Sequence, residues 1–81
     1  MKHAGADALT TLAGLIATIR EHGFKEPRPG VFYRRGKAFL HFHEDAAGLF
    51  ADLRVNDEWE RFRVTDADEQ AAFLRVLRAS A

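Results

Sequence analysis

The sequence contains no cysteine, and its 81 residues include only two prolines, both between residues 24 and 30. The absence of cysteine excludes disulfide bonds, thiolate metal ligands and a cysteine nucleophile. No apolar run approaches the roughly 18 residues that a membrane-spanning helix needs. The first residues also lack the apolar stretch of a secretory signal peptide, so a cytoplasmic location is expected.

Neither sign of charge is in excess, because twelve lysines and arginines balance twelve aspartates and glutamates. Hydrophobic residues make up 47% and charged residues 30% of the chain, which is typical of a folded protein. The length predicts one domain, 1–81, with residues 1–6 frayed. The charges are nevertheless segregated: residues 20–43 carry six bases against two acids, and residues 44–81 carry nine acids against five bases. A neutral chain can therefore still present a locally basic surface.

Apolar residues at steps of three and four predict one helix near each end of the chain. The first covers residues 7–22, and Gly23 favours its termination. The second opens with Thr65-Asp66-Ala67-Asp68-Glu69, which resembles a capping box with acids in the first turn. After the first helix, residues 24–30 contain both prolines and are expected to form an extended connector.

From residue 31 to residue 64 the apolar pattern has a period of two, which predicts strands at residues 31–34, 38–43, 49–55 and 58–64. The turns between them are short, so an antiparallel meander is expected. The turn lengths place Asp52 opposite both His41 and Arg61. The predicted fold class is α+β: a two-layer sandwich of order α-β-β-β-β-α, with a four-stranded antiparallel meander and both helices on one face. The first hairpin leaves open whether Phe32 or Tyr33 joins the core.

The face of this sheet that points away from the helices combines aromatic rings with arginines. Arginine and aromatic residues concentrate at the centres of protein interfaces, and monomers seldom leave a large apolar patch uncovered. We therefore expect a non-enzymatic interaction module that forms a homodimer or binds another protein through Phe39, Phe50, Arg54, Trp59, Arg61 and Arg63. A solvent-exposed face whose arginines stack on its own rings is the simpler reading of the same residues.

Binding of nucleic acid or another polyanion is the alternative function. Exposed rings beside arginines are suited to stacking and neutralising a single strand, so the same face is one candidate surface. The other is the basic segment 25–37, which contains Lys25, Arg28, Arg34, Arg35 and Lys37. Binding of this kind weakens steeply as salt is added.

A metal site is a minor alternative. His41 and His43 form a His-x-His pair on one predicted strand, so both rings point to the same side, with Asp52 opposite. Two imidazoles and a carboxylate can hold Zn²⁺ or another divalent ion. Because Arg61 competes for Asp52, an ion-paired row His41–Asp52–Arg61 is favoured instead, and no cofactor is expected. In that row the carboxylate would raise the pKa of His41.

Enzymatic activity is not expected. The chain has no G-x-G-x-x-G, P-loop or G-x-S-x-G sequence, and Ser80 is its one serine. The acidic pairs Glu44-Asp45 and Asp57-Glu58 fall in predicted turns, where carboxylates are normally solvated. A small antiparallel domain rarely encloses a substrate pocket of about 300 Å³, so no small-molecule substrate is expected.

Residues 31–55 resemble the YjbR-type "double wing" family of small bacterial proteins. The resemblance rests on Val31-Phe32-Tyr33-Arg34-Arg35-Gly36-Lys37-Ala38-Phe39, followed by His43-Glu44-Asp45 and Gly48-Leu49-Phe50-Ala51-Asp52-Leu53. It implies an α+β fold and a suspected DNA-binding role, and that family offers no catalytic residues to carry over. The whole chain is more similar to small bacterial proteins of unknown function that share a G-V-F-Y…F-L-H-F-H-E-D…G-L-F-A-D core.

Overall fold

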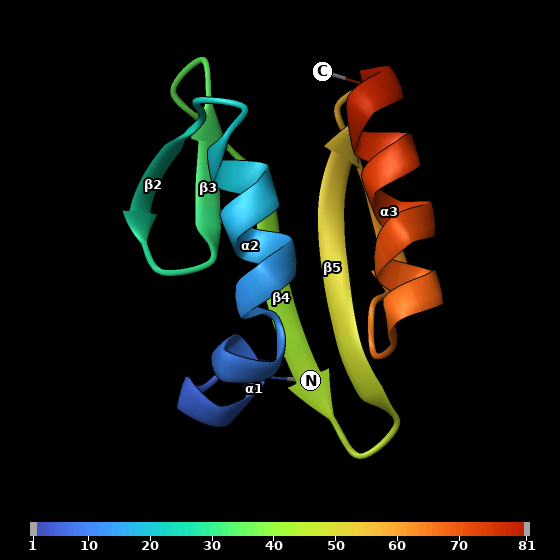
Figure 1. Cartoon of the computed structure of the whole chain (residues 1–81). Helices are drawn as coiled ribbons and strands as arrows, with labels where there is room; N and C mark the ends of the chain where they lie inside the picture. Colours follow the sequence, from blue (N-terminus) through green and yellow to red (C-terminus); the bar gives the residue numbers. More distant parts are fainter. Residues whose placement is uncertain (1, 81) are drawn as a thin grey trace.

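The computed structural model describes residues 2–80 and places helices on one face of an antiparallel sheet (Figure 1). The helices are α1 (Ala6–Thr11), α2 (Ala13–Arg20) and α3 (Ala67–Ser80). The strands are β1 (Lys2–His3), β2 (Lys25–Arg28), β3 (Val31–Arg34), β4 (Lys37–Asp45), β5 (Gly48–Val55) and β6 (Glu58–Arg63). The sheet order is β2-β3-β4-β5-β6, and β1 pairs with β4. The predicted α+β class is confirmed. None of these helices is long and apolar enough to cross a membrane.

Among residues 2–80 the sheet has six strands where the sequence predicted four. β2 occupies most of the predicted connector, and Pro27 is tolerated there because an edge strand does not need every ladder hydrogen bond. β1 lies within residues 1–6, where the prediction of a frayed end is wrong for the described residues. The Ala4 amide donates a 3.1 Å hydrogen bond to the Phe42 carbonyl, and the Gly5 amide donates a 2.7 Å bond to Glu44 Oε2.

The helix predicted over residues 7–22 is interrupted at Leu12, which separates α1 from α2. The hydroxyls of Thr10 and Thr11 donate hydrogen bonds to carbonyl oxygens four residues earlier, an interaction that bends helices. Leu12 itself is fully buried. The interruption thus redirects the chain without removing an apolar residue from the core.

The predicted registers of β4, β5 and β6 are confirmed. His41 pairs with Asp52, and Asp52 pairs with Arg61 on the other side. The β5–β6 turn places Asn56 at φ +53° and Asp57 at φ +65°. These are the positive values that a tight two-residue hairpin turn requires at both central positions. The short turns therefore determine the registers, as the sequence predicted.

The core lies between the helices and the covered face of the sheet. Phe32 is fully buried whereas Tyr33 is 37% exposed, which decides the open question of the first hairpin. Phe62 of β6 packs against Phe73 of α3, with ring centroids 5.4 Å apart. The buried cluster comprises Leu12, Leu15, Ile16, Ile19, Phe32, Phe39, Leu40, Phe42, Ala51, Leu53, Val64, Phe73 and Leu77.

Phe39 belongs to this core, and its predicted place on an exposed aromatic face is wrong. Phe32 pairs with Leu40 and Tyr33 pairs with Ala38, so Phe39 is an extra residue between two pairs. Such a bulge interrupts the alternation of side chains that the prediction assumed. The Phe39 ring is only 4% exposed, and the ring of Phe24 lies 5.0 Å from it.

We expect Phe39→Ala to lower the free energy of unfolding by about 3–5 kcal/mol, the usual cost of removing a buried phenylalanine. Since a chain of this length has roughly 3–5 kcal/mol in total, the variant should be largely unfolded at 25 °C. Circular dichroism and urea titration measure this loss. The control is Phe50→Ala, which removes a half-buried ring from β5 and should leave the protein folded. A folded Phe39→Ala protein with unchanged stability would contradict this assignment.

Candidate functional site

The face of the sheet opposite the helices carries most of the predicted site residues, and Arg54 stacks there on Trp59, as the simpler reading of this face expected. The Arg54 guanidinium lies 4.4 Å from the centroid of Trp59, and the His41 ring lies 4.6 Å from the same side chain. Trp59 remains 42% exposed, whereas Phe50 is half-buried. Arg63 forms an ion pair with Glu69 of α3, with 3.1 Å between Arg63 Nε and Glu69 Oε2. The predicted patch of three exposed rings is therefore reduced to Trp59.

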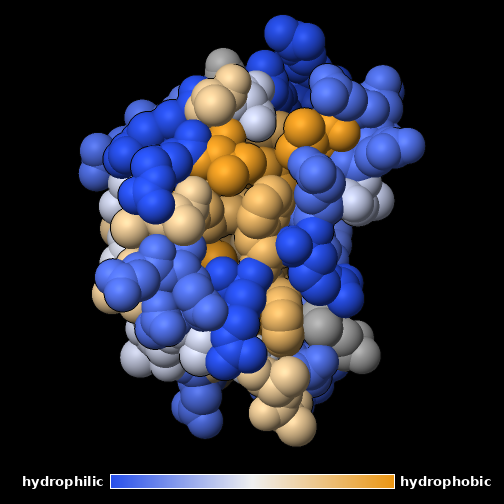
Figure 2. All heavy atoms as spheres, turned by 90° about the vertical axis from the view of Figure 1, so that its right-hand side faces the viewer, coloured by the Kyte–Doolittle hydropathy of each residue, from blue (hydrophilic) through white to orange (hydrophobic). Residues whose placement is uncertain are grey.

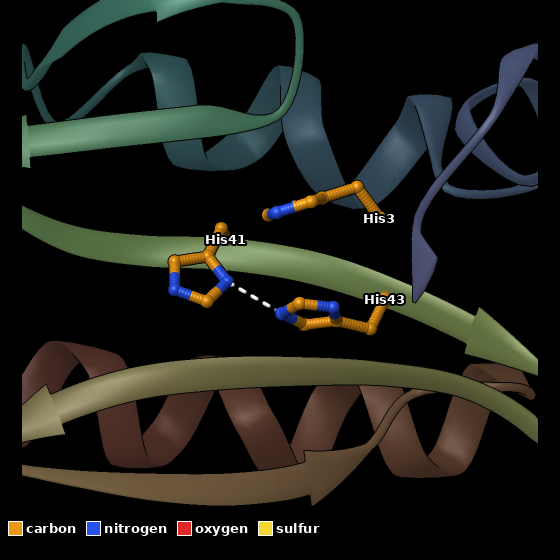
Figure 3. Close-up of side chains that lie close together, drawn as sticks. All are labelled: His3, His41 and His43. Atoms are coloured by element: carbon orange, nitrogen blue, oxygen red, sulfur yellow. Dashed lines mark hydrogen bonds between the residues drawn. The ribbon is translucent and has the colours of Figure 1, made fainter. Parts of the chain in front are cut away.

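Three histidines form a cluster on this face (Figure 3). His41 and His43 come from β4, as the sequence predicted, and His3 comes from β1, where it pairs with His43. His41 Nδ1 lies 2.7 Å from His43 Nε2, and the ring of His3 stacks on that of His43 with centroids 4.7 Å apart. One ligand nitrogen of each histidine lies within 4.8 Å of the others.

Asp52 is buried beside this cluster and is held by Arg61. Arg61 donates from Nε to Asp52 Oδ1 at 2.7 Å and from Nη2 to Oδ2 at 2.8 Å. His43 Nε2 lies 3.1 Å from Oδ2, so the histidine that contacts Asp52 is His43, and the predicted contact with His41 is wrong. The two bonds from Arg61 stabilise the carboxylate and hold the pKa of Asp52 below its ordinary value.

The pKa values of His41 and His43 are both lowered, mainly because burial disfavours the charged imidazolium. The charge of His43 lowers the pKa of His41 further, while Asp52 opposes the shift at both rings. The predicted rise in the pKa of His41 is therefore wrong. The sequence predicted that the Asp52 carboxylate lies near His41. The degree to which the His41 ring is buried could not be read from the sequence, and burial has the larger effect on its pKa.

The basic residues of segment 25–37 do not form one surface. A hollow of about 590 Å³ lies beside the β3–β4 and β5–β6 turns and the end of α3. Its cationic lining consists of Arg34, Arg35, Lys37 and Arg54, with Asp57 at the second turn. Lys25 and Arg28 lie on edge strand β2 and take no part in it. The structure thus keeps three of the five predicted polyanion residues together and adds Arg54 to them.

One residue of these sites was missed from the sequence, and another was predicted for a different surface. His3 belonged to the terminal segment predicted to fray, and only its pairing with β4 brings it to the cluster. Arg54 was assigned to the aromatic face, but its Nε donates 2.8 Å to the Ala38 carbonyl, which draws it towards the β3–β4 hairpin. The signal that could have found Arg54 is the predicted register, which already places it opposite residue 39.

No protein-family model, curated protein or solved structure matches this chain. The resemblance of residues 31–55 to the double-wing family accordingly stays a prediction.

We expect the metal-free protein to become less stable as pH falls from 7.5 to 5.5. The folded pKa values of His41 and His43 lie below the ordinary value near 6.5, so the unfolded chain binds more protons in this window. Their contribution is present above pH about 6.5 and is lost as pH falls through the folded values. Urea titrations at each pH, with a chelator present, measure the free energy of unfolding. An increase in stability on acidification would contradict the direction of these shifts.

Proposed function

We propose that the chain is a non-enzymatic module that binds the phosphate backbone of a nucleic acid in the hollow lined by Arg34, Arg35, Lys37 and Arg54. The observation that carries this proposal is the convergence on one hollow of four cationic side chains, which lie in or close to two turns. Phosphate contacts dominate the affinity of proteins for nucleic acids, and arginine binds phosphate oxygens through two parallel hydrogen bonds. The hollow therefore has the charge and the donors that a phosphodiester backbone needs.

Two of the arginines are held in position by the protein itself. Arg34 Nη1 donates 3.1 Å to the Ser80 carbonyl, and its guanidinium lies 5.2 Å from the centroid of Phe39. Arg54 is bonded to the Ala38 carbonyl and stacked on Trp59. A guanidinium has five N–H donors, so one backbone bond leaves most of them for a ligand. Positioning before binding reduces the entropy lost when the ligand is held.

The backbone at Arg35 gives further support. Arg35 has φ +53° and is followed by Gly36 at φ +79°, a turn in which asparagine or glycine is usual at the first position. The left-handed conformation costs a residue with a full side chain roughly 1–2 kcal/mol. Residues with a strained backbone are often found at functional sites, and the strained residue here, Arg35, lines the hollow.

The test is a fluorescence anisotropy titration with labelled single- and double-stranded DNA and RNA at several salt concentrations. Arg35→Asn should weaken binding and reduce the salt slope by about one phosphate contact, while raising stability by roughly 0.5–1 kcal/mol through relief of the turn. Lys37→Ala should weaken binding without the gain in stability. Each variant removes one positive charge from the lining of the hollow.

The matched controls are Lys25→Ala and Arg28→Ala, which remove the same charge from β2, outside the hollow. They should leave the salt slope and the affinity close to those of the unchanged protein. Equal weakening by the hollow and control variants would show that only overall charge matters. That result, or the absence of salt-dependent binding to every oligonucleotide, would overturn the proposal.

Self-association through the β6 side of the molecule is a second candidate. β6 is an edge strand, and an unpaired edge can pair with the same strand of another copy. Figure 2 shows an apolar strip between hydrophilic residues on the side of the molecule that carries α3. Phe62 of β6 and Leu74 and Val76 of α3 are partly buried hydrophobic residues, and Trp59 of β6 is exposed.

We expect Trp59→Asp to shift this assembly from dimer to monomer in sedimentation velocity, because a charge on β6 opposes edge pairing. Circular dichroism should be unchanged, since Trp59 is exposed. The control is Tyr33→Asp, which changes the other large exposed ring, on β3, and should leave the dimer intact. An unchanged protein that sediments as a monomer at millimolar concentration would remove this candidate.

A further inference from the structure

The histidine cluster has a feature that neither proposal above uses: its imidazole nitrogens face one another. His41 Nδ1 and His43 Nε2 are 2.7 Å apart, and Figure 3 shows His3 lying over the same pair. Neutral imidazole carries one proton for its two nitrogens, so each ring has one N–H donor and one nitrogen with a free lone pair. His43 Nδ1 is buried, so Nε2, which faces His41 Nδ1, is the nitrogen of His43 that a shared ion would bind. The three rings therefore offer up to three lone-pair nitrogens to an ion.

We propose that His3, His41 and His43 form a binding site for a divalent transition metal ion, with Zn²⁺ as the best-suited ion. Three imidazoles with one position left open are a known ligand set for Zn²⁺. The His-x-His pair on β4 and a third histidine on the neighbouring β1 bring the three rings to one side of the sheet. This inference is independent of the nucleic-acid proposal, because none of the three histidines lines the cationic hollow.

The distances are those of a site that closes with small side-chain movements. Around a tetrahedral ion with bonds of about 2.0–2.1 Å, two ligand nitrogens lie about 3.3 Å apart. His41 Nδ1 and His43 Nε2 are slightly closer than this, and the widest separation in the cluster stays within 4.8 Å. The His41 and His43 rings are tilted by 75° to one another, so their in-plane lone pairs can point to one centre. Rotation of the exposed His3 ring supplies the remaining adjustment.

Asp52 and Arg61 complete the surroundings of the site. Asp52 Oδ2 lies 3.1 Å from His43 Nε2, which places the carboxylate within reach of an ion bound to that nitrogen. Its two hydrogen bonds from Arg61 fix the carboxylate, and the guanidinium charge moderates its attraction for a cation. Binding therefore depends mainly on the three imidazoles, with water or Asp52 in the fourth position.

The position of His3 gives the metal a structural consequence. β1 is two residues long, and the Lys2–Glu44 ion pair beside it is largely exposed on the Lys2 side. Exposed ion pairs contribute little, so β1 is held weakly without another link. An ion shared by His3 and His43 would fasten β1 to β4. Hydrogen exchange at the Ala4 amide, which donates to Phe42, should slow when Zn²⁺ is added.

The experiment titrates Zn²⁺ into the full chain, without a polyhistidine tag, by calorimetry and thermal unfolding. We expect one ion per chain and a rise in Tm of about 10–20 °C when free Zn²⁺ exceeds Kd a hundredfold. Co²⁺ should give the visible absorption of a nitrogen-ligated ion of low coordination number. Cu²⁺ and Ni²⁺ are avoided, because a histidine close to a free amino terminus can bind them through backbone amides.

Three variants assign the ligands. His3→Ala should weaken Zn²⁺ binding at least tenfold and leave the fold intact, because His3 is exposed. His41→Gln should have the same effect on affinity, with circular dichroism to confirm folding. The matched control is His22→Ala, which removes the one histidine outside the cluster and should leave Kd unchanged. The proposal is overturned if Zn²⁺ neither binds nor raises Tm, if His3→Ala binds as tightly as the unchanged protein, or if His22→Ala loses as much affinity.

Discussion

The antiparallel register between β4 and β5 is the constraint on which both candidate sites depend. It places His41 opposite Asp52 and Phe42 opposite Ala51, so the polar pair lies on the open face and the apolar pair on the core. A shift by one residue would exchange the two faces and bury the histidines under the helices. The core prevents this shift, because the apolar members of the two strands would then lose their packing against α2 and α3.

The same ladder continues to β6 and explains how a carboxylate is buried on a sheet face that no helix covers. Asp52 is 7% exposed because its neighbours on both strands are long or aromatic. A buried charge is costly unless it is paired, and Arg61 provides the pairing with two hydrogen bonds. The open face is therefore more ordered than its exposure to solvent suggests, which is what a preformed binding site requires.

Trp59 lies between the two candidate sites. Its side chain contacts His41 of the histidine cluster on one side and Arg54, which lines the cationic hollow, on the other. It is the single tryptophan of the chain, so one fluorescence signal reports on both places. A ligand in the hollow would change the fluorescence of Trp59 through Arg54, whereas a metal ion would change it through His41. The two proposals can thus be followed in the same protein without an added label.

The sequence by itself determined the α+β class, the two helical ends and the β4–β5–β6 registers, because these follow from local periodicity and short turns. It also identified His41, His43 and Asp52 as neighbours. The tertiary structure decided what local pattern cannot encode. Pairing across 40 residues brought His3 to His43, and a bulge placed Phe39 in the core. Burial also reversed the expected direction of the His41 pKa, since desolvation depends on everything packed around a ring and not only on its nearest charge.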